Sequence, residues 1–296
     1  LGKTHTVITG YGPDSTNWEE GLSVCAGLLL RGPVALTEDD IARAPNLEVA
    51  ARHGVGVENI DIPAASKRGI AVLNTPYANT EAVAEYTFAL MLGLLRRTVE
   101  NDALVRRGFF ADRDSMLGAN LNGKRLGLVG FGRIARRVGE IAAQGFRMSV
   151  SAYDPYVAES EFVAHRTSRA EDLPSLLGNS DIVSVHVPLT EETRALIDEE
   201  KLSHMHEGSY LVHISRGGVV SEDALREALI GEKIRGAALD VFEQEPPNVD
   251  DSIFQAPNLL LSPHFGAHTE ESFRNMGVHA TEGIIDVLAG KSPSNA

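Results

Sequence analysis

The sequence has a single cysteine, no long hydrophobic run and no excess of positive charge. Because Cys25 is the only cysteine in 296 residues, an intrachain disulfide and a thiolate metal cluster are excluded, and we expect a reducing cytoplasm and no metal site. No apolar run approaches the ~18 residues of a transmembrane helix, and no signal-peptide pattern opens the chain. A formal net charge of −14 disfavours nucleic acid and anionic membranes as partners. Any anionic ligand must therefore be bound by local groups.

Length and composition indicate a globular protein with two domains. Hydrophobic residues make up 43% of the chain and charged residues 23%, and domains of about 150 residues are typical. Between residues 125 and 264, short apolar runs alternate with helical segments, which is the pattern of a parallel sheet covered by helices on both faces. The expected strands are residues 127–129, 148–153, 182–187, 209–214, 236–241 and 259–261.

Shorter elements in the first third of the chain predict a second, smaller α/β domain. Strands are expected at residues 6–9, 27–30, 47–50 and 70–73. Residues 80–97 predict a long apolar helix, and residues 270–288 predict a helix that can fold back on the first domain. We therefore predict a discontinuous substrate-binding domain, residues 1–97 and 272–296, and a dinucleotide-binding domain, residues 98–271.

Residues 125–135 predict a strand that passes through a glycine turn into a helix. Gly130 permits a tight turn, Gly132 leaves room for a pyrophosphate, and Ala135 allows the helix to pack closely on the strand. This G-x-G-x-x-A pattern alone is equally typical of an ordinary turn from strand to helix. About twenty residues further on, Asp154 ends the next strand, where a carboxylate can accept hydrogen bonds from an adenosine ribose. Together these residues indicate a dinucleotide site.

Three polar residues are expected at the carboxyl ends of strands, where ligands bind in doubly wound sheets. Arg216 can bind a substrate carboxylate through two hydrogen bonds. Glu245 and His264 can form a pair in which the carboxylate fixes the tautomer of the imidazole, which then exchanges a proton with the substrate. Taken singly, Arg216 is more often a surface residue and His264 a structural one. The set fits hydride transfer at a 2-oxo acid, which needs a cation, a proton donor and a positioned cofactor.

Ordered motifs in both halves of the chain resemble the D-isomer-specific 2-hydroxyacid dehydrogenases over about residues 26–290. The motifs are GVGVENID (54–61), RGI (68–70), NTP (74–76), GFGRIA (130–135), YDP (153–155), VHVPLT (185–190), SRGG (215–218), LDVFEQEP (239–246) and SPHFG (262–266). The resemblance implies an α/β fold of two Rossmann-like domains with doubly wound parallel sheets. It also implies that the NAD domain is inserted in a discontinuous, flavodoxin-like substrate domain.

Carried over position by position, the resemblance implies roles for individual residues. Arg216 binds the substrate carboxylate, His264 is the acid/base and Glu245 is its partner. The implied cofactor-binding residues are Gly130, Gly132, Arg133, Ile134, Asp154, Val187, Pro188, Ile214, Ser215, Arg216, Asp240, His264, Gly266 and Ala267. The implied substrate-binding residues are Arg31, Gly54, Val55, Gly56 and Arg216. A surface position is an equal alternative for Arg31.

The expected cofactor is NAD rather than NADP. A carboxylate at Asp154 would repel the 2′-phosphate of NADP, and residues 155–158 supply no arginine to bind it.

The resemblance further implies a homodimer, with the helices near residues 80–97 and 126–141 at the interface. Residues 10–26 are too few for the helix, strand and helix that the family usually has there, so either this domain is naturally reduced or residues are missing from the sequence; we favour the second.

The leading hypothesis is an NAD-dependent enzyme that interconverts a small 2-oxo acid and its D-2-hydroxy acid. The motifs GVGVENID (54–61) and YANT (77–80) favour a 3-phosphoglycerate dehydrogenase-like subgroup, with hydroxypyruvate/glyoxylate reductase as the alternative. A hypothesis from another class is a non-catalytic, NADH-sensing binding protein, like the corepressors that share this fold.

Overall fold

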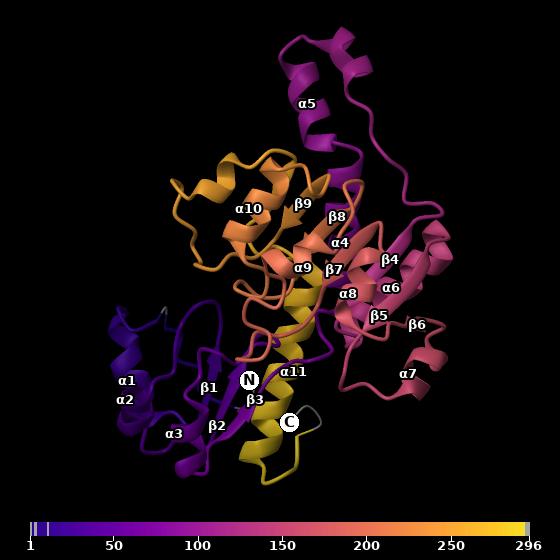
Figure 1. Ribbon diagram of the computed structural model, residues 1–296. Helices are drawn as coiled ribbons and strands as arrows, with labels where there is room; N and C mark the ends of the chain where they lie inside the picture. The colour runs from indigo at the N-terminus through magenta and orange to yellow at the C-terminus, as the bar shows by residue number, and fades with distance from the viewer. Residues whose placement is uncertain (1, 3–4, 11, 294–296) are drawn as a thin grey trace. The chain divides into compact units, whose positions relative to one another are not determined.

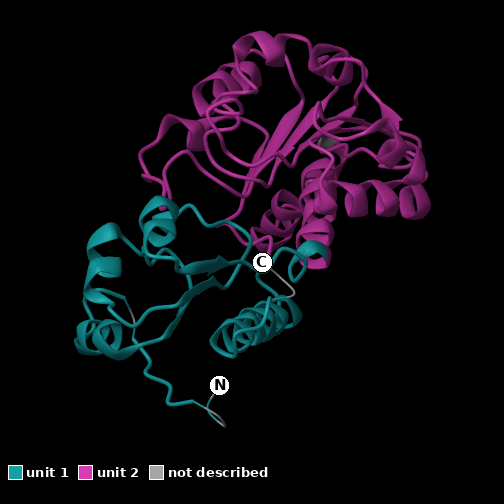
Figure 2. Ribbon diagram, turned by 90° about the horizontal axis from the view of Figure 1, so that it is seen from below, with its two compact units in different colours: residues 1–80, 268–296 teal, residues 81–267 magenta. Residues whose placement is uncertain are grey.

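The chain folds into two compact units, of which the second is inserted in the first along the sequence (Figure 1). The computed structural model describes residues 2, 5–10 and 12–293. Unit 1 comprises Leu1–Thr80 and His268–Ala296, and unit 2 comprises Glu81–Ala267 (Figure 2). The predicted division after residue 97 differs from the structural one, because helix α4 (Thr80–Leu95) packs Phe88 and Met91 into the core of unit 2.

The strands of unit 2 form one seven-stranded parallel sheet in the order β10-β9-β8-β7-β4-β5-β6 (Figure 1). Their bounds are β4 Arg125–Val129, β5 Ser149–Tyr153, β6 Ser168–Arg169, β7 Ile182–Val185, β8 Tyr210–His213, β9 Gly236–Leu239 and β10 Leu259–Leu261. The strands that follow β4 lie first on one side of it and then, from β7 on, on the other side. Such a reversal places the ligand crevice outside the carboxyl ends of the strands.

Helices cover both faces of this sheet. Successive strand residues point to opposite sides, so Leu211 joins an apolar cluster with residues of α8, α9 and α10, whereas Val212 joins another with residues of α4 and α6. The helices are α4 Thr80–Leu95, α6 Arg133–Phe146, α7 Glu159–Ala164, α8 Leu173–Gly178, α9 Glu199–Ser203 and α10 Glu222–Ile230. The central strands β7, β8 and β9 are apolar runs because helices keep water from both of their faces. The prediction of a parallel α/β fold is confirmed.

Unit 1 is a smaller α/β layer around a three-stranded parallel sheet in the order β1-β2-β3. The elements are β1 Gly27–Leu30, β2 Val49–Arg52, β3 Ala71–Leu73, α1 Thr16–Val24, α2 Glu38–Arg43, α3 Ile62–Lys67 and α11 Glu270–Leu288. On one face, Trp18 of α1 and Ile41 of α2 pack with Ala50. On the other face, Ile284 of α11 packs with Val49, so the last helix covers the sheet of the first segment.

Three local features differ from the sequence-based expectations. Residues 6–9 form no strand, because they are exposed and pair with no strand among the described residues. Strand β6 was not predicted, since Ser168 and Arg169 form no apolar run. Helix α5 (Thr98–Arg106) and the 3₁₀ helix Phe110–Ser115 form an arm that projects from the sheet of unit 2 (Figure 1). None of the described helices is both long and apolar enough to cross a membrane.

Candidate active site

The glycine turn between β4 and α6 has the open space that a pyrophosphate needs. Gly130 has a φ of +88°, and a Cβ there would lie 2.8 Å from Val187 Cγ1, so this position requires glycine. Gly132 is the N-cap of α6, and no described atom beyond its neighbours lies within 4 Å of its Cβ position. The N–H groups of Arg133 and Ile134 open the helix, whose dipole favours an anion at this end. The turn therefore fits a bound diphosphate.

Asp154 directly follows β5 and is held beside this turn. Its Oδ2 accepts a hydrogen bond from the N–H of Phe131 at 2.9 Å, and its Oδ1 accepts one from the N–H of Tyr156 at 3.0 Å. Each oxygen has a further lone pair, so the carboxylate can also accept hydrogen bonds from ribose hydroxyls. The contact between Asp154 and a ribose stays a prediction.

The other predicted residues of unit 2 also follow the carboxyl ends of strands in the same sheet. They are Val187 and Pro188 after β7, Ile214, Ser215 and Arg216 after β8, Asp240 after β9, and His264, Gly266 and Ala267 after β10. Because the strands are parallel, these ends lie along one edge of the sheet. The structure thus places the catalytic candidates and the glycine turn on the same edge of unit 2.

His264 and Glu245 form the predicted imidazole–carboxylate pair. Nδ1 of His264 lies 2.7 Å from Oε2 of Glu245, and Oε1 of Glu245 accepts a hydrogen bond from the N–H of Phe242 at 3.1 Å. Since a carboxylate accepts, Nδ1 carries the hydrogen and Nε2 is left to exchange a proton with a ligand. Burial raises the pKa of Glu245, but the interactions with His264, the hydrogen bond from the N–H of Phe242 and the charge of Arg216 outweigh burial, so this pKa lies below its usual value.

Asp240 and Tyr86 hold the loop that carries His264. His264 itself has a left-handed backbone conformation, with a φ of +54°. The buried carboxylate of Asp240 accepts hydrogen bonds from the N–H groups of Phe265 at 2.8 Å and Gly266 at 2.9 Å. The hydroxyl of Tyr86, on α4, lies 2.6 Å from Ser262 Oγ, just before the loop. The contact of Asp240 with a nicotinamide stays a prediction. Sequence reasoning missed Tyr86, because its position in an apolar helix carries no signal of this long-range contact.

Arg216 follows β8, next to the strand that leads to Glu245. Its Nη1 donates a hydrogen bond to the carbonyl oxygen of Ser215 at 2.7 Å, and its side chain is half-buried. A Cβ at the neighbouring Gly217 would lie only 1.6 Å from the carbonyl oxygen of Phe242. Position 217 therefore requires glycine, because the loop after β8 packs there directly on the backbone of the loop after β9. This close approach explains why the charge of Arg216 acts on Glu245.

The substrate-binding candidates of unit 1 follow its first two strands. They are Arg31 after β1, and Gly54, Val55 and Gly56 after β2. Gly54 has a φ of +144°, and its N–H donates to Thr75 Oγ1 at 3.1 Å, which fixes the loop. The guanidinium of Arg31 lies 4.7 Å from the ring centre of Phe273, on α11. Arg31 is thus held against an aromatic ring within unit 1, and its role toward a substrate stays a prediction.

Comparison with known proteins identifies sequence relatives along most of the chain. Residues 88–266 match the sequence model of the family described as "D-isomer specific 2-hydroxyacid dehydrogenase, NAD binding domain". A D-3-phosphoglycerate dehydrogenase of Methanocaldococcus jannaschii is 40% identical over 90% of this chain and 51% of its own length. A hydroxypyruvate reductase of Thermotoga maritima is 38% identical over 88% of this chain and 84% of its own length. The chain thus spans about half the length of the D-3-phosphoglycerate dehydrogenases that it matches.

Solved structures agree with the sequence comparison. The crystal structure of D-lactate dehydrogenase from Aquifex aeolicus, complexed with NAD and lactic acid, has a TM-score of 0.81 and 31% identity, covering 92% of this chain and 85% of that chain. The matched family model is an NAD-binding domain. The prediction of NAD as the cofactor is therefore confirmed.

Proposed function

Because the chain belongs to the D-isomer-specific 2-hydroxyacid dehydrogenase family, we propose that it is an NAD-dependent oxidoreductase that interconverts a 2-oxo acid and a D-2-hydroxy acid. The observation that carries the proposal is the 2.7 Å contact between His264 Nδ1 and Glu245 Oε2, on the edge of the sheet that also carries the glycine turn. A purely structural histidine needs neither that location nor an ionised partner.

Arg216, His264 and Glu245 have different roles in the proposed reaction. The bound cofactor supplies or accepts the hydride. Arg216 holds the substrate carboxylate through paired hydrogen bonds and so orients the carbonyl carbon. Nε2 of His264 gives a proton to the carbonyl oxygen during reduction and takes it back during oxidation. Glu245 keeps Nδ1 protonated and stabilises the imidazolium when it forms.

The same edge of the sheet supplies the groups that hold the cofactor. The turn at Gly130 and Gly132, with the first N–H groups of α6, binds the pyrophosphate, and Asp154 binds the adenosine ribose. The remaining predicted contacts are Val187 and Pro188 on the adenine side, and Ile214, Ser215, Asp240, Gly266 and Ala267 on the nicotinamide side.

For the substrate, we favour a 3-phosphoglycerate dehydrogenase-like activity, with hydroxypyruvate or glyoxylate reduction as the alternative. Relatives of both names have similar identity to this chain. Arg31 and the loop from Gly54 to Gly56 are the proposed contacts of unit 1 with the substrate, and a cation at Arg31 suits a phosphorylated acid.

Oxidation of NADH by the purified protein, measured with a panel of 2-oxo acids, tests this function. Phosphohydroxypyruvate is the expected preferred substrate over hydroxypyruvate, glyoxylate and pyruvate. The variant His264→Ala should lose at least about a hundredfold in turnover, the scale of general acid–base catalysis, while its affinity for NADH is unchanged. NADH binding without turnover of any acid by the wild-type protein would instead favour the non-catalytic sensor.

We further propose a homodimer in which the arm of unit 2 contacts a second copy. Helix α5 buries none of its own residues, and Val105, Phe109 and Phe110 expose 60%, 51% and 63% of their surface. Exposed apolar side chains gathered on one projecting segment are typical of an interface. Light scattering after gel filtration should give a dimer for the wild type and a monomer for Phe110→Ser. The control Val249→Ser, at a residue that is 83% exposed outside the arm, should remain dimeric.

A further inference from the structure

A pocket of about 180 Å³ lies in unit 2 at the edge of the sheet opposite to the candidate active site. Tyr210 begins β8, Arg235 immediately precedes β9 and Asn258 immediately precedes β10, and all three line the pocket. The catalytic candidates follow the carboxyl ends of the same three strands. The pocket is therefore separate from the groups that bind the cofactor and from Arg216, Glu245 and His264.

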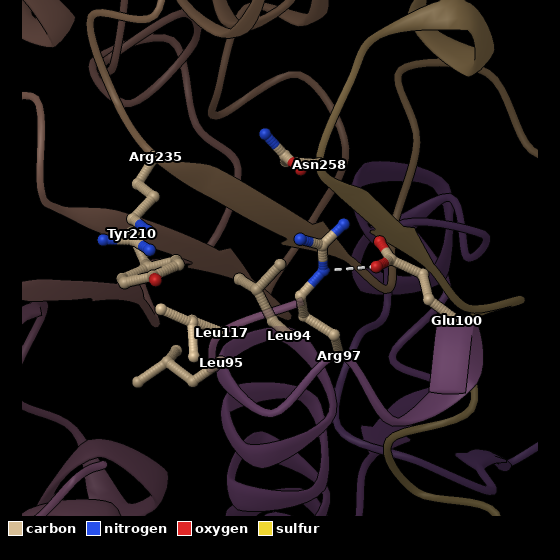
Figure 3. A pocket seen from close by; sticks show the side chains of 8 residues that line it. All are labelled: Leu94, Leu95, Arg97, Glu100, Leu117, Tyr210, Arg235 and Asn258. Atoms are coloured by element: carbon tan, nitrogen blue, oxygen red, sulfur yellow. Dashed lines mark hydrogen bonds and ion pairs between the residues drawn. The ribbon is translucent and has the colours of Figure 1, made fainter. Parts of the chain in front are cut away.

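The charged residues that line the pocket are two arginines and one glutamate. Figure 3 shows Arg235 and Tyr210 on one side and Arg97 with Glu100 on the other. Arg97 is paired with Glu100, whereas the guanidinium of Arg235 forms no ion pair among the described residues. Arg235 is exposed at the rim of the pocket, so its guanidinium is accessible to an anion from solution. Such an anion would pair with the guanidinium.

Tyr210 adds a hydrogen-bond donor to the two cations. Its side chain is 5% exposed, and burial raises its pKa, although the charges of Arg235 and Arg97 lower it. The phenol is therefore protonated near neutral pH and can donate its hydrogen. All three side chains line the same pocket, with Arg235 beside Tyr210 and Arg97 across the pocket from them (Figure 3).

We propose that this pocket binds a small oxyanion, the phosphate or carboxylate group of a metabolite, between Arg235 and Arg97 with the hydroxyl of Tyr210 as a third donor. Planar guanidinium groups match the oxygens of both anions through paired hydrogen bonds. The volume lies below the roughly 300–1,000 Å³ of pockets for drug-sized ligands, which favours a small anion over a nucleotide.

The anion would also act on the start of the arm. Arg97 has a left-handed backbone with a φ of +52° and is the N-cap of α5, and Glu100 lies in the first turn of that helix. An anion bound to Arg97 competes with Glu100 for the same guanidinium. Binding is therefore coupled to the contact that holds the first turn of the arm.

Isothermal titration of inorganic phosphate into the full chain tests the site. Saturating NADH keeps the glycine turn occupied, and sodium chloride keeps the ionic strength constant. The variant Arg235→Gln should weaken phosphate binding at least tenfold, and Tyr210→Phe should weaken it severalfold. The matched control Lys233→Gln removes the same charge from an exposed residue just before Arg235 and should bind phosphate as the wild type does.

Succinate, titrated in parallel, distinguishes the two sources of the oxyanion. Binding of phosphate alone assigns the pocket to a phosphate-bearing metabolite, and binding of both assigns it to oxyanions in general. The proposal is overturned if neither anion binds, if chloride competes equally, or if Arg235→Gln and Lys233→Gln have the same effect. None of these outcomes depends on turnover, so they leave the proposed dehydrogenase activity untouched, and NADH oxidation tests that activity separately.

Discussion

Oδ2 of Asp240 accepts a hydrogen bond of 2.9 Å from the N–H of Gly266, and through this bond the end of β9 holds the loop that carries His264. The carboxylate is 1% exposed, and its other oxygen accepts from the N–H of Phe265. A buried acceptor with two backbone donors is costly to alter, because any donor that loses its partner remains away from water. The position of His264, the proposed acid/base, thus depends on Asp240, which has no proposed role in the proton transfer.

Asp240→Asn should therefore lower both stability and turnover. The amide nitrogen would face one of the two N–H groups, so one buried donor loses its acceptor at a cost of about 2 kcal/mol. Urea unfolding measures the change in the free energy of unfolding, and NADH oxidation measures the loss of turnover. Asp250→Asn is the control, because Asp250 is exposed and should leave both unchanged. Equal stability of the two variants would show that the loop does not depend on this carboxylate.

Gly132→Ala should weaken cofactor binding with little effect on the fold. The added Cβ meets no described atom within 4 Å, so it occupies the space that the pyrophosphate needs. Loss of a glycine N-cap costs at most about 1 kcal/mol, while the affinity for NADH should fall at least tenfold. Fluorescence titration with NADH measures the affinity, and thermal unfolding measures the stability.

The control for this variant is Gly145→Ala, at the far end of the same helix. A Cβ there meets Ile141 only at 4.0 Å, so the fold can accept it. Its affinity for NADH should equal that of the wild type. If Gly132→Ala also binds NADH normally, the pyrophosphate does not lie over this turn.

Local patterns predicted the elements whose signal lies within their own residues. The last helix has the predicted bounds, residues 270–288, because the Thr269 side chain caps its N-terminus and its apolar residues recur at helical spacing. Asp154 was placed beside the glycine turn by spacing alone, since one strand and one helix separate the two in any such unit. Residue types at strand ends likewise led to the prediction of Arg216, Glu245 and His264 as the catalytic residues, and the structure brings Glu245 and His264 into contact.

Other features depend on contacts between distant segments, which no local pattern encodes. The strand expected at residues 6–9 failed because an apolar run forms a strand only where a neighbour pairs with it. The need for glycine at Gly217 depends on the carbonyl oxygen of Phe242, and the support of Ser262 depends on Tyr86. The arm was not foreseen because α5 buries none of its residues and so shows no clear apolar face.

Asp154→Ala should narrow the preference for NADH over NADPH. Removal of the carboxylate removes the repulsion of a 2′-phosphate, so the ratio of the two kcat/KM values should fall, mainly through a lower KM for NADPH. The substitution also removes the acceptor of the Phe131 N–H, which loosens the turn for both cofactors. Asp154→Ser separates the two effects, because a hydroxyl can still accept that hydrogen bond without a charge. An unchanged ratio in both variants would place the ribose elsewhere.

His213 should make the protein less stable as the pH falls below neutrality. It ends β8, is 2% exposed and has a pKa lowered by burial to about 4, although the backbone of Arg216 and the charge of Glu245 oppose this. Between pH ~4 and pH ~6.5, His213 binds a proton in the unfolded chain but not in the folded chain. The stabilisation is thus complete above pH ~6.5 and is lost toward pH ~4, by an amount on the order of 3 kcal/mol.

Urea unfolding of His213→Leu at several pH values in this range measures the effect. Leucine is close in size to the imidazole and cannot take up a proton, so the free energy of unfolding of the variant should depend less steeply on pH than that of the wild type. His204→Leu, at an exposed residue of the same unit, should keep the wild-type slope. If the free energy of unfolding depends on pH equally steeply in the wild type and in His213→Leu, the imidazole of His213 accepts a proton as readily in the folded chain as in the unfolded one. Water that reaches the imidazole from the active-site edge of the sheet would have this effect.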